Sequence, residues 1–158
     1  MNSELITNWG HHDQSLRKIL ELATQSLRIF DEDLSKLKLE QTENAELLRR
    51  FLGADRQHIL CIVVRNAEPF RRESPRLMSL LTLFPQNMTI HESPPHLASL
   101  SDSLVIADDR HALVRFHKDG ARSKAIIDDA EQCKPYVNRF EGILKEGGEQ
   151  VCASTLGL

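Results

Sequence analysis

The chain has 158 residues, of which 41% are hydrophobic, so it can bury one sizeable core but not two comfortable ones. Its formal net charge of -3 arises from 20 basic and 23 acidic residues spread along the whole sequence. This balance excludes a strong global field that would draw the protein to nucleic acid or anionic lipid. The longest apolar runs, such as Ile59–Val64, are far too short to span a bilayer, so we expect no membrane partner.

The cysteines and the N-terminus favour a cytoplasmic protein. Cys61, Cys133 and Cys152 form an odd set without C-x-x-C spacing, which fits a reducing compartment. Residues 1–13 lack the basic and apolar segments of a secretory signal. We expect a flexible N-terminus over residues 1–13, one folded domain over 14–146 and a loose C-terminal tail over 147–158.

The first part of the chain alternates helix and strand. Apolar residues at helical spacing predict a helix from about Gln14 to the mid-twenties. A short strand over 27–30 follows, and the acidic residues 31–33 are typical of a strand end. A second helix is expected from Thr42 to a glycine stop at Gly53.

A strand buried on both faces is expected next, because residues 59–64 are continuously apolar and rich in β-branched side chains. Ser74-Pro75 is typical of a helix start, since proline is favoured at the first helical position. A short strand over 88–91 follows that third helix.

The last part of the chain predicts a hairpin and a long helix. Strands over 104–107 and 111–116 are separated by a tight polar connection, and residues 125–127 are a further strand candidate. An apolar face from Ala130 to Leu144 predicts the closing helix, which Pro135 should either kink or begin. The element order indicates a single-domain α/β sandwich with a mixed, mostly parallel sheet flanked by helices.

One segment carries the frame of a known catalytic motif. Residues 101–108 read Ser-x-Ser-x-x-x-x-Asp, with Ser101, Ser103 and Asp108 at the spacing of the H-x-K-x-x-x-x-D motif. In this frame and in its element order from about Leu16 to Lys145, the chain resembles one half of a phospholipase D-like protein. It is also similar to uncharacterised bacterial domains of that outline, which share stretches like residues 74–77 and 105–108.

The resemblance implies a phospholipase D-like fold without the catalytic residues of that family. In the active family the histidine attacks phosphorus and the lysine neutralises the phosphate oxygens. Ser101 and Ser103 supply neither an imidazole nor a positive charge, and a serine without a nearby base is a poor nucleophile. The G-S-x-N signature of the family is replaced by residues 115–118, Arg-Phe-His-Lys. We therefore assign no catalytic residue and no cofactor.

A second use of the same residues is anion binding. Residues two apart on a strand share a face, so Ser101 and Ser103 should point together, and Arg115 and His117 share a face of the next strand. With Asp108, these five residues are candidates for a phosphate-binding site, because arginine matches phosphate geometry. The alternative is a solvent-facing edge with core residues behind it.

Other patterns favour ordinary surface roles. The contiguous His117-Lys118-Asp119 lacks the spacing of the catalytic motif and is typical of a turn. The seven histidines show no metal-binding spacing, and no glycine loop for a nucleotide occurs. Arginine clusters at residues 49–50, 65 and 71–72 could contact phosphate, but aromatic residues do not interleave with them, which does not favour nucleic acid.

Three hypotheses follow. The first is a catalytically inactive phospholipase D-like domain that acts as a binding or assembly module, with a homodimer as one form of assembly. The second is a regulatory domain for a phosphate-containing ligand at Ser101, Ser103 and Arg115. The third is a divergent phosphodiesterase that uses His96, His111 or His117 instead of the motif histidine.

Overall fold

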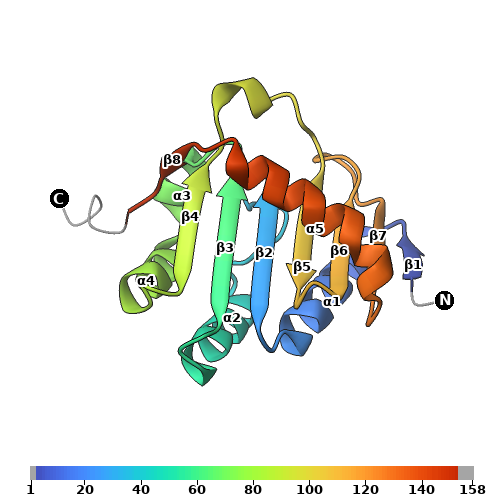
Figure 1. Ribbon diagram of the computed structural model, residues 1–158, viewed down its shortest axis with the longest axis horizontal. Helices are drawn as coiled ribbons and strands as arrows, with labels where there is room; N and C mark the ends of the chain where they lie inside the picture. Colours follow the sequence, from blue (N-terminus) through green and yellow to red (C-terminus); the bar gives the residue numbers. More distant parts are fainter. Residues whose placement is uncertain (1–2, 153–158) are drawn as a thin grey trace.

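A mixed eight-stranded sheet forms the centre of the molecule, in the strand order β1-β7-β6-β5-β2-β3-β4-β8. The computed structural model describes residues 3–152. Helices cover both faces of the sheet (Figure 1), which confirms the expected single-domain α/β sandwich. The strands are β1 Ser3–Ile6, β2 Ser26–Asp31, β3 Ile59–Val64, β4 Met88–Glu92, β5 Ser103–Ala107, β6 His111–Arg115, β7 Ser123–Ile126 and β8 Glu149–Gln150.

Parallel pairing is concentrated at the centre of this sheet. β3 lies parallel to both β2 and β4, whereas the other neighbouring pairs are antiparallel. The parallel pairs need helical crossovers, and the predicted alternation of helix and strand supplies them. The parallel share is nevertheless smaller than we expected, because the β5–β6 hairpin, β7 and the short edge strands β1 and β8 all add antiparallel pairs.

The helices divide the apolar side chains into two layers. They are α1 Trp9–Leu22, α2 Thr42–Ala54, α3 Glu68–Glu73, α4 Pro75–Leu83 and α5 Ala130–Lys145, with a short 3-10 helix η1 over Pro95–Leu97. α5 crosses one face of the sheet diagonally, and α1, α2 and α4 lie on the other (Figure 1). The alternation of side chains along each strand therefore feeds two hydrophobic clusters, one on each face.

Both ends of the described chain are more regular than we expected. β1 pairs with β7, and α1 begins at Trp9 with Asn8 as its N-cap, so residues expected to form a flexible N-terminus belong to regular elements. The Asn8 side chain accepts a hydrogen bond from the His11 amide at 2.8 Å, a cap signal that helical spacing alone does not show. In the expected loose tail, β8 pairs with β4, and Val151 is buried. Residues 153–158 of that tail lie outside the described residues.

Smaller differences have local causes. α2 passes through Gly53, because glycine weakens a helix but does not forbid it, and ends at Ala54. Pro135 lies inside α5 and neither begins nor ends it, so the helix continues without the hydrogen bond that an amide there would give to the Glu131 carbonyl. The short helix α3 was missed, since six residues give too little periodicity to detect.

Two close turns fix the ends of the sheet. Asp108 and Asp109, in the β5–β6 connection, both adopt a left-handed backbone with φ of 56°, which aspartate tolerates better than most residues. Gly148 has φ of 122°, and a side chain there would collide with the carbonyl oxygen of Glu92. Glycine is therefore needed where the chain leaves α5 and approaches β4.

Among the described residues, no helix combines the length and the hydropathy that crossing a bilayer requires.

Candidate functional site: the edge where the degenerate motif begins

The motif strand begins at the upper edge of the sheet in Figure 1, where β2 and β3 end. We call this region the motif edge and define it by Asp31, Arg65, Ser101, Ser103 and Arg115. Ser103 lies directly opposite Arg115 in the β5–β6 pair. Their side chains share the face that packs against α1, because Val105 and Leu113, two residues away on each strand, belong to the hydrophobic cluster of that face.

A buried ion pair occupies the motif edge. The Arg115 Nη2 atom donates to Oδ1 of Asp31 at 2.7 Å, and both side chains are 1% exposed. The other Asp31 oxygen, Oδ2, accepts from the amides of Asp33 and Leu34. Asp31 therefore ends β2, as we expected, and also anchors the arginine of β6.

Two residues of α1 cover this ion pair. The Arg115 guanidinium lies 5.4 Å from the centroid of the Trp9 ring, within the range of a cation–π contact. The rings of Trp9 and His12 meet edge to face at 5.1 Å. His12 is 0% exposed, and burial, with a smaller contribution from the charge of Arg115, lowers its pKa below the ordinary value. Neutral imidazole is thus the favoured form of His12.

Several buried donors at the motif edge have no partner among the described residues. They are Nε and Nη1 of Arg115 and Nη2 of Arg65; the Nε2 atom of His12 is likewise unpaired. Burial is the main cause that lowers the pKa of Arg65, and Asp31 and Asp102 act in the opposite direction. A water molecule or an anion would satisfy buried donors of this kind, since an unsatisfied polar group costs free energy.

The start of β5 is held by two arginines. Arg65 Nη1 donates to the backbone carbonyl of Asp102 at 2.8 Å, and Arg139 of α5 forms two 2.8 Å hydrogen bonds with the Asp102 carboxylate. Ser103 is 2% exposed and Ser101 is half-buried. The motif strand is therefore fixed in place, and its inner serine fills space rather than facing an open cleft.

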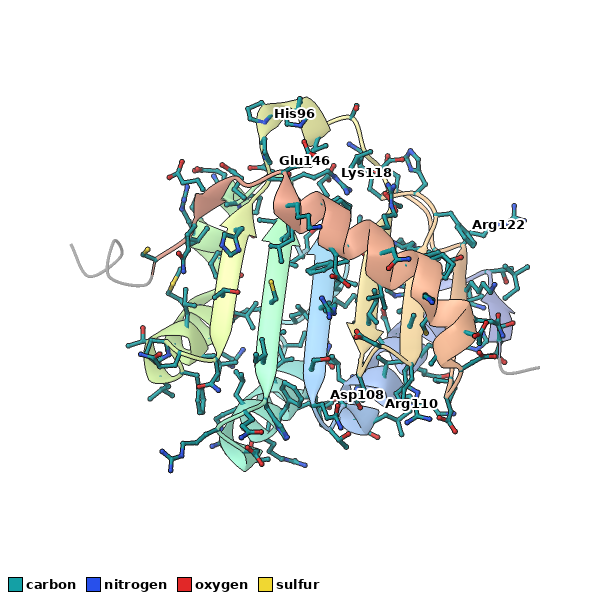
Figure 2. The ribbon with its side chains drawn as sticks, viewed as in Figure 1. His96, Asp108, Arg110, Lys118, Arg122 and Glu146 are labelled. Carbon is teal, nitrogen blue, oxygen red and sulfur yellow. The ribbon has the colours of Figure 1, made fainter. Side chains whose placement is uncertain are left out.

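Asp108 lies at the opposite end of the motif strand. Ser103 and Asp108 are five residues apart on an extended strand, which separates them by about 16 Å. Figure 2 shows Asp108 beside Arg110 at the lower end of the molecule, whereas Lys118 lies at the upper edge. The structure therefore brings Ser103 and Arg115 together but not Asp108.

The Asp108 carboxylate has a structural environment. It accepts hydrogen bonds from the amides of Thr24, Gln25 and Ser26 at 2.7–3.1 Å and from the Thr24 hydroxyl at 3.0 Å. Burial alone would raise the pKa of Asp108, but these hydrogen bonds together bring it below the ordinary value. Asp108 thus ties the β5–β6 turn to the segment that leads into β2.

The three histidines considered as replacement nucleophiles lie apart. His96 is in the arch above the sheet and contacts Glu146 at 2.7 Å (Figure 2). His117 is exposed in the β6–β7 connection, and its Nδ1 atom accepts from the Asp119 amide. His111 lies at the Asp108 end, where its Nδ1 atom accepts from the Asp128 amide. The described residues contain no group of three metal-ligating side chains.

Sequence reasoning missed the partners of Arg115. Asp31 is 84 positions away, so no local spacing connects the two residues. Trp9 and His12 fell in the segment that we expected to be flexible. A signal did exist. Arg115 directly follows three apolar strand residues, and a continuous apolar run is typical of a strand that is buried on both faces.

The family is decided by a match of residues 10–150 to the model of a domain of unknown function, DUF7931. The chain belongs to this family. No curated protein matched this DUF7931 chain.

Solved structures show the fold of this DUF7931 domain. Nuc from Salmonella typhimurium, a phospholipase D family member, is 12% identical with a TM-score of 0.65, and the match covers 95% of this chain and 99% of Nuc. NucT from Helicobacter pylori is 12% identical with a TM-score of 0.60 and coverage of 93% and 98%. These similarities confirm a phospholipase D-like fold.

An archaeal chromatin protein, TrmBL2, whose structure shows a mode of DNA binding, also matches, at 12% identity and a TM-score of 0.68. The match covers 96% of the DUF7931 chain but only 55% of TrmBL2, so this chain spans about half the length of that protein. At such identity, the similarity concerns the fold.

Proposed function

We propose that this chain is a catalytically silent phospholipase D-like domain that acts as a binding or assembly module. The observation that carries the proposal is the set of residues that occupy the motif edge. Where the active family requires a histidine and a lysine that face a phosphate, this chain has Ser101, a buried Ser103 and the buried Arg115–Asp31 pair. The phosphohistidine mechanism lacks both of its reacting groups here.

The nearest buried histidine does not replace the lost nucleophile. His12 lies beside Trp9 and has an unpaired Nε2 atom, but its side chain is fully enclosed. A phosphodiester would reach that nitrogen only if Trp9 and the first turn of α1 moved away. Such a closed arrangement favours a structural role for His12 over nucleophilic catalysis.

A measurement of the oligomeric state tests the proposed assembly. Active members of the phospholipase D-like superfamily combine two motif halves, and this chain contains one, so a homodimer is the expected form. Light scattering over a wide range of protein concentration should give twice the mass of the 18.0 kDa chain. A constant monomer over the whole range would contradict the homodimer.

Binding of a phosphate-containing anion at the motif edge is the second candidate function. The specific observation in its favour is that buried donors of Arg65 and Arg115 lack partners among the described residues, and that both guanidinium groups interact with the charge of Asp31. Two guanidinium groups with unused N–H donors match the oxygens of a phosphate group.

Calorimetric titration with inorganic phosphate tests this second candidate. We expect saturable binding that Arg65→Gln weakens at least tenfold and that Arg50→Gln, on the exposed side of α2, leaves unchanged. Absence of binding, or equal binding by both variants, would mean that water satisfies the buried donors instead.

A further inference from the structure

A second candidate site lies at the β4–β8 end of the sheet, on the same face as α1 but away from the motif edge. A groove of about 970 Å³ runs between α3, α4, the start of β4 and residues 150–152. Its apolar lining is provided by Pro75, Met78, Leu81, Pro85, Met88 and Val151. The volume is in the range of sites that enclose a small organic ligand.

Two arginines complete the lining of this groove. Arg71 and Arg72 belong to the last turn of α3, and their side chains are 34% and 63% exposed. Their nearest acidic groups, Glu149 and Glu73, are each 3.9 Å away, too far for a good hydrogen bond. Within the described residues, both guanidinium groups thus keep their donors available to a ligand.

The type of ligand follows from the combination of an apolar lining with two arginines. Methionine, leucine and proline side chains favour a flexible apolar chain, and methionine adapts readily to irregular shapes. Two neighbouring guanidinium groups favour a carboxylate, which can accept parallel hydrogen bonds from an arginine. A nucleic acid does not fit, because no aromatic side chain lines the groove for stacking.

We propose that this groove binds a single-chain amphiphile with a carboxylate head, of the fatty-acid class. The hydrocarbon chain lies on Met78, Leu81 and Met88, and the carboxylate pairs with Arg71 and Arg72. The site is independent of the motif edge, so it extends the proposed function and does not depend on it. The proposal also assigns a specific binding role to the Arg71-Arg72 pair.

Fluorescence titration of the full chain with a dansyl-labelled long-chain fatty acid, displaced by the unlabelled acid, tests the proposal. We expect saturable binding that the double variant Arg71→Gln/Arg72→Gln weakens at least tenfold, since charged hydrogen bonds to the head are lost. The unlabelled alcohol of the same chain length should displace the probe at least tenfold less effectively. Arg49→Gln/Arg50→Gln, an exposed pair on α2, is the matched control and should bind normally.

A second variant tests the groove without a change of charge. Ser79 is an exposed residue of α4 that lines the groove, so Ser79→Trp should block the hydrocarbon chain and abolish binding while the protein stays folded. Circular dichroism confirms folding in each variant.

Four results with the full chain would overturn the proposal. They are absence of binding, equal displacement by acid and alcohol, unchanged binding in the double arginine variant, and association only with anionic phospholipid vesicles. Uptake of the fatty acid only after removal of residues 153–158 would also contradict it, because the occupant would then be the chain itself.

Discussion

At the scale of single residues, the two ends of the motif strand have different roles. Ser103 lies in the buried motif edge beside Arg115, whereas Asp108 binds three successive backbone amides at the other end of the strand. Asp108 therefore stabilises a turn. This structural role does not require reacting groups at the other end of the strand.

Replacement of Asp108 by asparagine should lower the free energy of unfolding by about 1.5–3 kcal/mol at neutral pH, because hydrogen bonds to a charged acceptor are lost. Asparagine tolerates the left-handed backbone, so the change isolates the carboxylate. Urea unfolding measures the effect. Asp109→Asn, which removes only a partly exposed contact with Arg28, is the control and should change stability by less than about 1 kcal/mol.

The Asp108 effect should depend on pH with a defined sign. The folded pKa lies below its unfolded value of about 3.9, so the carboxylate contributes its full stabilisation above that pH. The contribution disappears as the pH falls through the folded pKa. The stability difference between the wild type and Asp108→Asn should therefore shrink in acid, and a difference that grows below pH ~4 would contradict this role.

The buried Arg115–Asp31 pair should behave as a unit. Asp31→Asn or Arg115→Met alone leaves one buried charge unpaired and should cost about 3–5 kcal/mol of stability. The double variant removes both charges and should cost clearly less than the sum of the two. Urea unfolding of the four proteins measures the coupling, and additive effects would show that the two charges do not stabilise each other.

At the scale of elements, α5 seals one face of the sheet. Its buried residues Cys133, Val137, Phe140 and Ile143 form one hydrophobic cluster with residues of β2, β5, β6 and β7. The pKa of the Cys133 thiol is raised to about 11, chiefly by burial and then by Asp129 and Asp109. The thiol is thus enclosed and protonated at neutral pH.

Cysteine labelling reports on this helix. With a thiol-exchange reagent at pH 8, exposed Cys152 should react quickly, Cys61 slowly, because burial raises its pKa, and Cys133 only after unfolding. Mass spectrometry identifies the modified residue. Rapid native labelling of Cys133 would mean that α5 detaches readily from the sheet.

The elements also show what the sequence can predict. Continuous apolar strands, the β5–β6 hairpin and the amphipathic face of α5 depend on local patterns, and all lie where they were expected. β1, α3 and β8 escaped notice because each is short and lacks a run of apolar residues. The Arg115–Asp31 pair escaped because it joins distant segments, and only the assembled sheet makes them neighbours.

At the scale of the whole molecule, one sheet carries two separate regions of interest. The motif edge is closed by a buried ion pair, and the groove beside α3 and α4 is open and apolar. The fold is phospholipase D-like, and the positions at which we expect the motif histidine and lysine hold Ser101 and Ser103. Binding, rather than phosphodiester chemistry, is the activity that we propose for this arrangement.

Hydrolysis of bis(p-nitrophenyl) phosphate tests the central claim of catalytic silence most directly. Purified wild-type chain should release nitrophenol at the rate of buffer alone, under conditions in which an active phospholipase D family enzyme gives a clear signal. Hydrolysis above background that persists through purification, and that His12→Ala, His96→Ala, His111→Ala or His117→Ala removes, would contradict the claim.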